Sequence, residues 1–454
     1  MATIMFYVST LQGEFNGSLK LAKTLKSLGH KVFYLGVPDS EEKVRQHGFS
    51  FLSILEKWFP KGFFQQQDNN NLNLSGLRLL LEQKKDMKLM KSLIDSLYKG
   101  ENREIHNVLK EIDPDLLLIG TATPTDASVI TLIAYECKIL TIYLTDTLIS
   151  LPSQKNLIQQ DKNIKSTENS GYSLLSNKYQ FKHWKQAIIN KFPWLIKRGF
   201  YEKFMRKFAR SRKIPQELLD FSNSLPLKLP HLFLFPEELD FPDSSKEGCY
   251  YAEASIDLQR EEPSFDWSKL DKNKALIYCS LGTTGETFQT LSKNKVQFFF
   301  QNVIDAVSFK KEYQLVVSVS DHINLEDFHS VPENAIIINR APQLALLEKA
   351  SLAIIQGGAH TVKECIFFGV PMIVFPVIAD QPANAERIKY HGLGLVGDIK
   401  NTSVSLIMDL VEKIENDFLL KQRLETWKNK FREIENSGKA TKFILEILEE
   451  KKRI

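Results

Sequence analysis

The stretch IIQGGAHTVKECIFFGVPMIVFPVIADQPANAERI, residues 354–388, gives the clearest indication of the fold of this chain. An apolar strand ends at Gln356, a glycine pair follows, and a helix is expected to begin near His360. A second strand, PMIVFP, is followed by another turn and another helix. Consecutive strand–helix units of this kind predict a parallel sheet with right-handed crossovers.

The same alternation extends outward to both ends of the chain. The second half also contains ALIYCS, YQLVVS and AIIIN, and the first half contains TIMFYVS, KVFYLGV, DPDLLLIG and ILTIYL. Each is a short apolar run bounded by turn residues, with a helical pattern nearby. The predicted fold class is therefore α/β, with two doubly wound, Rossmann-like domains that face each other across a cleft.

A polar, turn-rich stretch over residues 242–272 separates the two halves. We expect a first domain over residues 1–245, a second over 246–430, and a C-terminal helix, 431–454, that packs back toward the first domain. The polar run QQQDNNNLNLS, residues 65–75, is expected to form a surface loop. Ligands of doubly wound sheets bind outside the carboxyl ends of the strands, so the cleft between the domains is the expected site.

Length and composition exclude several classes of protein. The 454 residues suit two domains, and 43% hydrophobic with 25% charged residues is a globular composition. Four cysteines lie far apart and form no C-x-x-C, which argues against a zinc site or a disulfide framework. The start has no signal-peptide pattern, and no uncharged run reaches the roughly 18 residues of a membrane span. A cytoplasmic protein is expected.

One segment is strongly basic although the net charge is only +4. Residues 182–213 hold eleven lysines and arginines against one acid, with large aromatic residues between them. Three interpretations stay open: a solvated helical pair whose aromatics pack inward, a peripheral contact with an anionic membrane, or binding of an acidic acceptor. Nucleic acid is not expected, because no nucleic-acid-binding motif accompanies the segment.

The turn after Gln356 has the chemistry of an anion site. Gly357 and Gly358 allow close approach of a backbone, and the following helix offers free N–H groups at its positive end. Thr361 adds a hydroxyl, and the Glu364 carboxylate can accept from sugar hydroxyls. After the next strand, polar side chains suited to a hydroxyl-rich group follow at Asp380 and Gln381. The plain alternative is an ordinary strand–turn–helix with a capped start.

These residues resemble the donor signature of the UDP-glycosyltransferase family, nucleotide-sugar-dependent enzymes of the GT-B fold. That signature reads approximately H-G-G-x-[GN]-[ST]-x-x-E, then G-V-P, then P-x-x-x-D-Q-x-x-N-A. The chain supplies its members in order: Gly357, Gly358, Thr361, Glu364, Gly369, Val370, Pro371, Pro376, Asp380, Gln381, Asn384 and Ala385. RAPQLALL resembles the family's W-x-P-Q-x-x-x-L turn without its tryptophan, and IYCSLGT resembles its V-Y-V-S-x-G-[ST] strand end.

The resemblance implies a role for each matched position. The uracil is expected at residues 340–343, the ribose at Glu364, the diphosphate at the strand end and the glycine turn, and the sugar at Asp380 and Gln381. The expected donor-binding residues are Gly13, Ser280, Gly282, Thr283, Arg340, Ala341, Pro342, Gln343, Gln356, Gly357, Gly358, Ala359, His360, Thr361, Glu364, Asp380 and Gln381. The chain departs from the pattern at Gln356, where the family has a phosphate-binding histidine. An imidazole stands instead at His360.

The first loop raises the question of the catalytic base. The family reads G-H-x-x-P there, with the histidine oriented by an aspartate at the end of a later strand. Here Glu14 replaces the histidine, and Gly120 stands in place of the aspartate. A carboxylate base needs no partner to fix a tautomer, so the two changes are consistent with each other. The expected catalytic residue is Glu14, with Asp126 as a second candidate; the plain alternative is that Glu14 only favours the positive helix end.

The resemblance implies an inverting glycosyltransferase that moves a hexose, glucose by default, from a UDP-sugar to a small apolar, phenolic or lipid-like acceptor. The UDP-sugar is a co-substrate, and no metal or other cofactor is expected, because helix dipoles and N–H donors can stabilise the departing diphosphate. The replaced residues at 14, 120 and 356 motivate an alternative, a non-catalytic nucleotide-sugar-binding or auxiliary protein. A nucleotide-sugar epimerase on the same fold is a further alternative.

Overall fold

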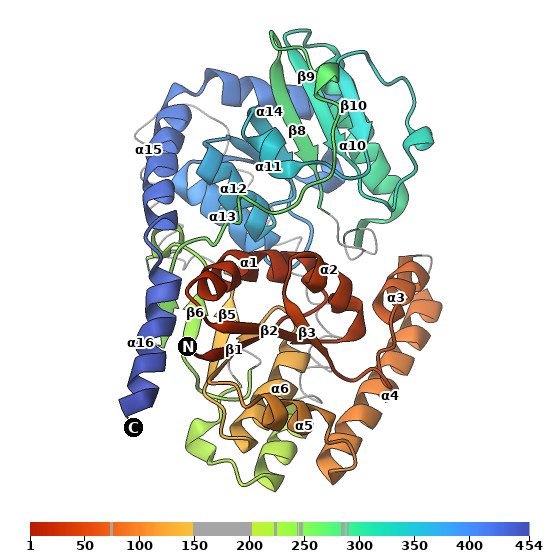
Figure 1. The fold of residues 1–454 in the computed structure, drawn as a ribbon. Coiled ribbons are helices and arrows are strands. Elements are labelled where there is room, and N and C mark those ends of the chain that lie inside the picture. The colour runs from red at the N-terminus through yellow and green to blue at the C-terminus, as the bar shows by residue number, and fades with distance from the viewer. Residues whose placement is uncertain are drawn as a thin grey trace.

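The computed structural model describes residues 1–72, 76–148, 202–221, 225–242, 244, 248–282, 287 and 290–453. It consists of two α/β units stacked one above the other, with a pair of C-terminal helices along one side of both (Figure 1). The α/β class and the parallel sheets predicted from the sequence are confirmed.

The first unit is built on a seven-stranded parallel sheet in the order β3-β2-β1-β4-β5-β6-β7. Its strands are β1 (Thr3–Tyr7), β2 (Lys31–Gly36), β3 (Ser50–Ser53), β4 (Leu116–Gly120), β5 (Thr141–Thr145), β6 (His231–Phe233) and β7 (Cys249–Tyr251). Its helices are α1 (Gln12–Ser27), α2 (Glu41–Gln46), α3 (Phe63–Leu72), α4 (Gly76–Lys99), α5 (Glu104–Ile112) and α6 (Pro124–Glu136). The sheet extends past the expected limit at residue 245, because β7 pairs in parallel with β6.

The second unit is built on a six-stranded parallel sheet in the order β10-β9-β8-β11-β12-β13. Its strands are β8 (Ala275–Ser280), β9 (Tyr313–Ser318), β10 (Ala335–Ile338), β11 (Ala350–Ile355), β12 (Met372–Val374) and β13 (Gly394–Val396). Its helices are α10 (Lys293–Ser308), α11 (Gln343–Leu347), α12 (Ala359–Phe368), α13 (Gln381–His391) and α14 (Val404–Asn416). The C-terminal pair consists of α15 (Phe418–Glu435) and α16 (Lys439–Arg453).

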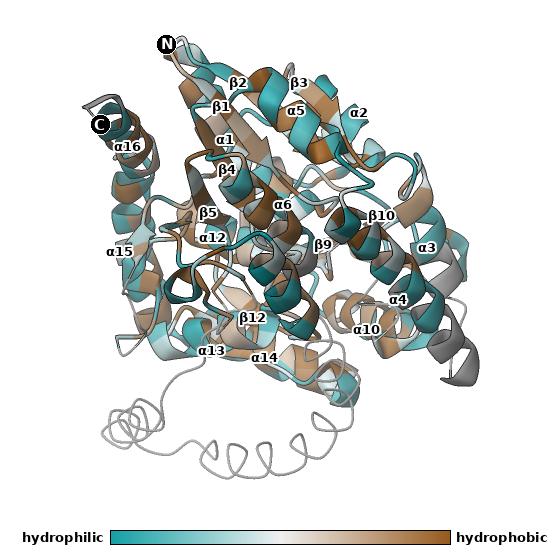
Figure 2. Ribbon diagram, turned by 90° about the horizontal axis from the view of Figure 1, so that it is seen from below, coloured by the Kyte–Doolittle hydropathy of each residue, from teal (hydrophilic) through white to brown (hydrophobic). Residues whose placement is uncertain are grey.

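Continuous apolar strands are the local reason for these sheets. All five residues of β4 are buried, as expected for a parallel strand covered on both faces. Alternate residues feed two cores: Leu117 and Ile119 pack on one face, and Leu116 and Leu118 on the other. The helices carry mixed polar and apolar residues around the largely apolar β1 (Figure 2). Among the described helices, none is long and apolar enough to cross a membrane.

The expectation of a surface loop over residues 65–75 is wrong for its first part, because α3 runs from Phe63 to Leu72. Tertiary contacts stabilise the start of this helix against its polar composition. The Asp39 carboxylate accepts hydrogen bonds from the backbone N–H groups of Gly62 and Phe64. The rings of Phe63 and Phe64 pack against Phe59.

In both sheets the strand order reverses at one point, between β1 and β4 and between β8 and β11. Such switch points leave a crevice at the carboxyl ends of the strands. Figure 1 shows α1 and α2 of the first unit facing α12 and α13 of the second. The two crevices therefore face each other, and the segments that follow β1, β4, β8 and β11 are the segments that can build a shared site.

Candidate active site

Glu14 lies in the first turn of α1 and is fixed by both switch-point loops of the first sheet. Its side chain is only 5% exposed. Its Oε2 accepts a hydrogen bond of 2.6 Å from the Ser9 backbone N–H, and its Oε1 accepts one of 2.8 Å from the Ala122 N–H. The carboxylate therefore bridges the loop after β1 and the loop after β4.

Gly120, the last residue of β4, makes room for this carboxylate. A Cβ atom at position 120 would collide with the carboxylate carbon and with Oε1 of Glu14. An aspartate at this strand end and Glu14 in its observed position thus exclude each other. The two departures from the family pattern, Glu14 and Gly120, therefore depend on each other, because Glu14 fits only where position 120 has no side chain.

The environment of Glu14 makes its carboxylate unusually basic. Burial, and then the charge of Asp146, raise the pKa of Glu14 to about 7, although the hydrogen bonds from Ser9 and Ala122 oppose the shift. A pKa near 7 suits a general base, because about half of the groups are deprotonated at neutral pH and the carboxylate binds a proton well. Asp126, in the first turn of α6, has its pKa raised to about 6 by burial.

The second sheet contributes the glycine turn between β11 and α12. Gly357 adopts a left-handed φ of +87°, and a Cβ atom there would lie 2.7 Å from Val374 Cγ1, so the tight turn requires glycine. Gly358 precedes the first residue of α12. One backbone donor of the helix is already used: the Ala359 N–H donates to Asp380 Oδ2 over 3.1 Å.

Gln356 and the β8 strand end meet beside this turn. Gln356 extends over Gly282, whose φ is +74° and where a Cβ atom would collide with the Gln356 amide nitrogen. Thr287 Oγ1 donates to Gln356 Oε1 over 3.5 Å, and the Gly282 N–H donates to Ser280 Oγ over 3.1 Å. The structure thus brings Gly282, Ser280 and Gln356 together; Thr283 lies outside the described residues.

Glu364, the expected ribose ligand, is 2% exposed and already engaged at both oxygens. Its Oε1 accepts from Arg260 Nη1 over 2.5 Å, and its Oε2 accepts from Gln343 Nε2 over 2.5 Å. Gln343 also donates to Thr361 Oγ1 over 3.3 Å, so three expected donor residues form one network. Sequence reasoning missed Arg260, and its only signal was its place in the charged linker stretch QREEP.

Other expected donor residues are less available to a ligand. Arg340 is exposed and pairs with Asp321 at the surface over 2.5 Å. Gln381 is 4% exposed, and its side-chain oxygen accepts from the Val377 and Ile378 N–H groups. Burial raises the pKa of Asp380, whose Oδ2 also accepts from Asn384 Nδ2 over 2.7 Å. Gln381 and Asp380 therefore shape the loop after β12 as well as facing the glycine turn.

One contact joins the two halves of the site directly. His360 Nε2, at the start of α12, lies 2.7 Å from Oδ2 of Asp146, which follows β5 in the first unit. Burial acts to raise the pKa of Asp146, but the hydrogen bond and the charge of His360 hold that pKa below its usual value. The His360 ring packs on Gly13 and Gly17 of the first loop and α1. Sequence reasoning assigned no role to Asp146.

The comparisons with known proteins agree with this geometry. The family model described as Erythromycin biosynthesis protein CIII-like, C-terminal domain, matches residues 302–430, which contain the glycine turn and Glu364. Two curated relatives come from Bacillus subtilis (strain 168). The Uncharacterized UDP-glucosyltransferase YojK is 27% identical over 197 residues, which cover 43% of this chain and 46% of the relative. The NDP-glycosyltransferase YjiC is 29% identical over 193 residues, which cover 42% and 46%. These matches span about half the length of each relative.

Two solved structures extend the likeness to the whole fold. The glycosyltransferase of kitacinnamycin has a TM-score of 0.68 at 19% identity and covers 98% of both chains. The glycosyltransferase VinC in complex with dTDP has a TM-score of 0.64 at 14% identity and covers 99% of this chain and 100% of its own. The fold is the GT-B fold of these enzymes. Over the aligned half, the chain is similar in sequence to nucleotide-sugar glycosyltransferases.

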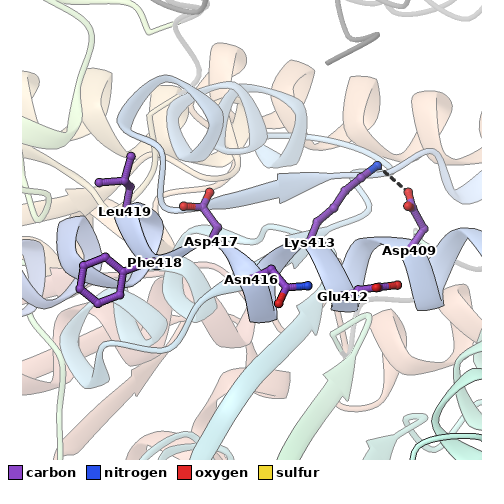
Figure 3. Close-up of a pocket in the computed structure, with 7 residues that line it drawn as sticks. All are labelled: Asp409, Glu412, Lys413, Asn416, Asp417, Phe418 and Leu419. Carbon is purple, nitrogen blue, oxygen red and sulfur yellow. Dashed lines mark hydrogen bonds and ion pairs between the residues drawn. The ribbon is translucent and has the colours of Figure 1, made fainter. Parts of the chain in front are cut away.

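The candidate site described above lies between the two units and is separate from the surface hollow drawn in Figure 3. That hollow is lined by residues of α14, α15 and their junction, among them the exposed Phe418 and Leu419 and the ion pair between Lys413 and Asp409. It contains none of the expected donor or catalytic residues.

Proposed function

We propose that the protein transfers a hexose, with glucose as the default, from a UDP-sugar to a small apolar, phenolic or lipid-like acceptor, with inversion at the anomeric carbon. The observation that carries the proposal is that the donor-signature residues and Glu14 lie at the switch points of the two sheets, which face each other (Figure 1). The ordered donor signature lies on one side, and Glu14, with its pKa near 7, lies on the other. The names of the curated relatives support a nucleotide-sugar donor.

In this proposal the second unit holds the donor. The diphosphate lies at the amino end of α12, beside Ser280 and the turn at residues 358–361, where backbone N–H groups and the helix dipole favour negative charge. The ribose hydroxyls donate hydrogen bonds to the Glu364 carboxylate, and Arg260 gives up its contact with that carboxylate. Asp380 and Gln381 line the sugar end.

The first unit holds the acceptor and Glu14. Glu14 takes the proton of the acceptor hydroxyl or amine as the oxygen or nitrogen attacks the anomeric carbon, and UDP leaves from the opposite side. Backbone N–H groups that hold the carboxylate on two sides fix its direction before the acceptor binds. Each carboxylate oxygen accepts one of these bonds and has a second lone pair for the acceptor.

A second candidate function is a non-catalytic nucleotide-sugar-binding protein. The observation that favours it is that both oxygens of Glu14 and both oxygens of Glu364 already have protein partners. One experiment separates the two functions. The protein is incubated with UDP-glucose and a panel of phenols, sterols and lipids, and released UDP is measured. Release that depends on acceptor supports transfer, whereas saturable UDP-glucose binding without release supports the non-catalytic function.

A further inference from the structure

His360 stands at the reaction cleft with a partner from the other unit. Its Nε2–H donates to Asp146 Oδ2 over 2.7 Å, and no described residue bonds to its Nδ1. The side chain of Asp146 is 8% exposed and that of His360 is 19% exposed, so the pair is largely removed from water while the imidazole keeps an open edge. The bond to this buried carboxylate fixes the orientation of the ring.

The chain lacks a charged group where the family has one. Gln356 is neutral, and its amide is turned over Gly282 and toward Thr287. The departing diphosphate gains negative charge in the reaction and needs positive charge near it. His360 lies on the same turn, one step into the helix whose amino end is the expected diphosphate site.

The first unit is shaped to accept this imidazole. A Cβ atom on Gly13 would lie 3.2 Å from His360 Cδ2, and one on Gly17 would lie 3.0 Å from His360 Cε1 and 3.2 Å from Asp146 Cβ. The ring therefore occupies a space that two glycines leave free, next to Glu14. Lys363 also holds Asp146 in place, since its Nζ donates to the Asp146 backbone oxygen over 3.3 Å.

We infer that His360, held by Asp146 of the opposite unit, is the cationic group that binds the departing diphosphate in place of the histidine that position 356 lacks. The Nε2–H group keeps its hydrogen bond to Asp146 Oδ2, and the Nδ1–H group donates a hydrogen bond to a phosphate oxygen. The inference rests on the proposed donor function. Because Asp146 belongs to the first unit and His360 to the second, binding of the diphosphate by His360 is also coupled to the contact between the two units.

The test is calorimetric binding of UDP and of uridine to the full-length protein and to four variants. His360→Asn should lose about 10- to 100-fold in UDP affinity, the value of one hydrogen bond to a charged group, with uridine affinity unchanged. Asp146→Asn should show a smaller loss with the same selectivity for UDP. His329→Asn, at an exposed histidine of the second unit, is the matched control.

Gly17→Ala tests the pair without removing a titrating group. Its methyl group displaces the ring, while alanine favours a helix more than glycine does, so a selective loss of UDP affinity is not explained by unfolding of α1. The other charged groups around the pair are Glu14, Lys363 and Asp380.

Unchanged UDP affinity in His360→Asn, or equal losses for UDP and uridine, would overturn the inference and leave the proposed function standing. A loss of turnover with unchanged UDP affinity would also overturn it, because His360 would then act on the acceptor. A wild-type protein that binds neither UDP nor thymidine diphosphate would contradict the proposed function itself, and the inference with it.

Discussion

At the scale of single residues, Glu14 shows how the surroundings of a carboxylate change its pKa. Its carboxylate is buried, lies near Asp146, and is held by two backbone N–H groups. The first two features raise its pKa and the third limits the rise. Glu14 and Gly120 could be matched to each other from the sequence, but the steric reason for the match appears only when the carboxylate is seen over the glycine.

Glu14→Gln keeps the size of the side chain and removes the base. We expect kcat to fall by about 10²- to 10⁴-fold, with donor affinity nearly unchanged. In the wild type the deprotonated form is active, so kcat should rise with pH through about 7 and level off above it. A pH profile of both proteins checks this, and wild-type turnover in Glu14→Gln would show that Glu14 only holds the loops together.

The contact between Arg260 and Glu364 gives a second test at this scale. Their side chains are 12% and 2% exposed, and removal of one partner of a buried ion pair costs about 3–5 kcal/mol. Arg260→Met should therefore lower the free energy of unfolding in urea by an amount of this order. UDP should restore part of the lost stability if its ribose hydroxyls donate hydrogen bonds to Glu364.

Glu364→Ala should weaken UDP binding by about 1–3 kcal/mol, and identical UDP affinity in that variant would remove Glu364 from the site.

At the scale of elements, apolar patterns predicted the strands well, because a strand buried on both faces requires an uninterrupted apolar run. The pattern failed at α3, where polar residues form a helix. Its start depends on Asp39, a residue from a different part of the chain, and on aromatic packing. Contacts of this kind are not encoded in local periodicity.

The basic segment at residues 182–213 is described only from residue 202. In that part Phe208 is buried, Phe204 packs against the same core, and Lys203, Lys207 and Arg210 are exposed. The aromatics of this part pack inward, so any membrane contact here would depend on charge. Peripheral binding to an anionic membrane stays a proposal.

Liposome flotation tests that proposal. Binding should require anionic lipid and weaken when Lys203, Arg206, Lys207 and Arg210 become glutamine. The matched control replaces four basic residues of α15, namely Lys421, Arg423, Lys428 and Lys430, with glutamine. Absence of flotation at low salt would rule the membrane contact out, because charge attraction is strongest there.

At the scale of the whole molecule, the C-terminal helices connect the units. Lys20 of α1 pairs with Glu435 at the end of α15, and the Glu435 carboxylate also accepts from the Ile256 N–H. Beyond it, α16 packs its apolar face into the core of the first unit through Ala440, Ile444 and Leu448. Asp146 and His360 add a contact at the cleft itself. Such pairs join distant parts of the chain, so sequence reading could place each residue on an element but could not join them.

Ile444→Ala tests the packing of α16. Ile444 is fully buried, so the loss of its side chain should lower the free energy of unfolding by about 2–5 kcal/mol. Phe418→Ala is the control, because Phe418 is 74% exposed and its removal should change stability by less than about 0.5 kcal/mol. Urea unfolding followed by tryptophan fluorescence measures both, and equal stabilities would show that α16 does not support the first unit.

The stereochemistry of the product distinguishes inverting transfer with Glu14 as the base from other functions. The protein is incubated with UDP-glucose, whose glucose is α-linked, and with an acceptor that triggers UDP release, and the glucoside is examined by proton NMR. We predict that the wild type forms a β-glucoside, seen as a large coupling between the protons on C1 and C2, and that Glu14→Gln forms much less of it. An α-glucoside, or no glucoside with any acceptor while UDP-glucose binds normally, would contradict it.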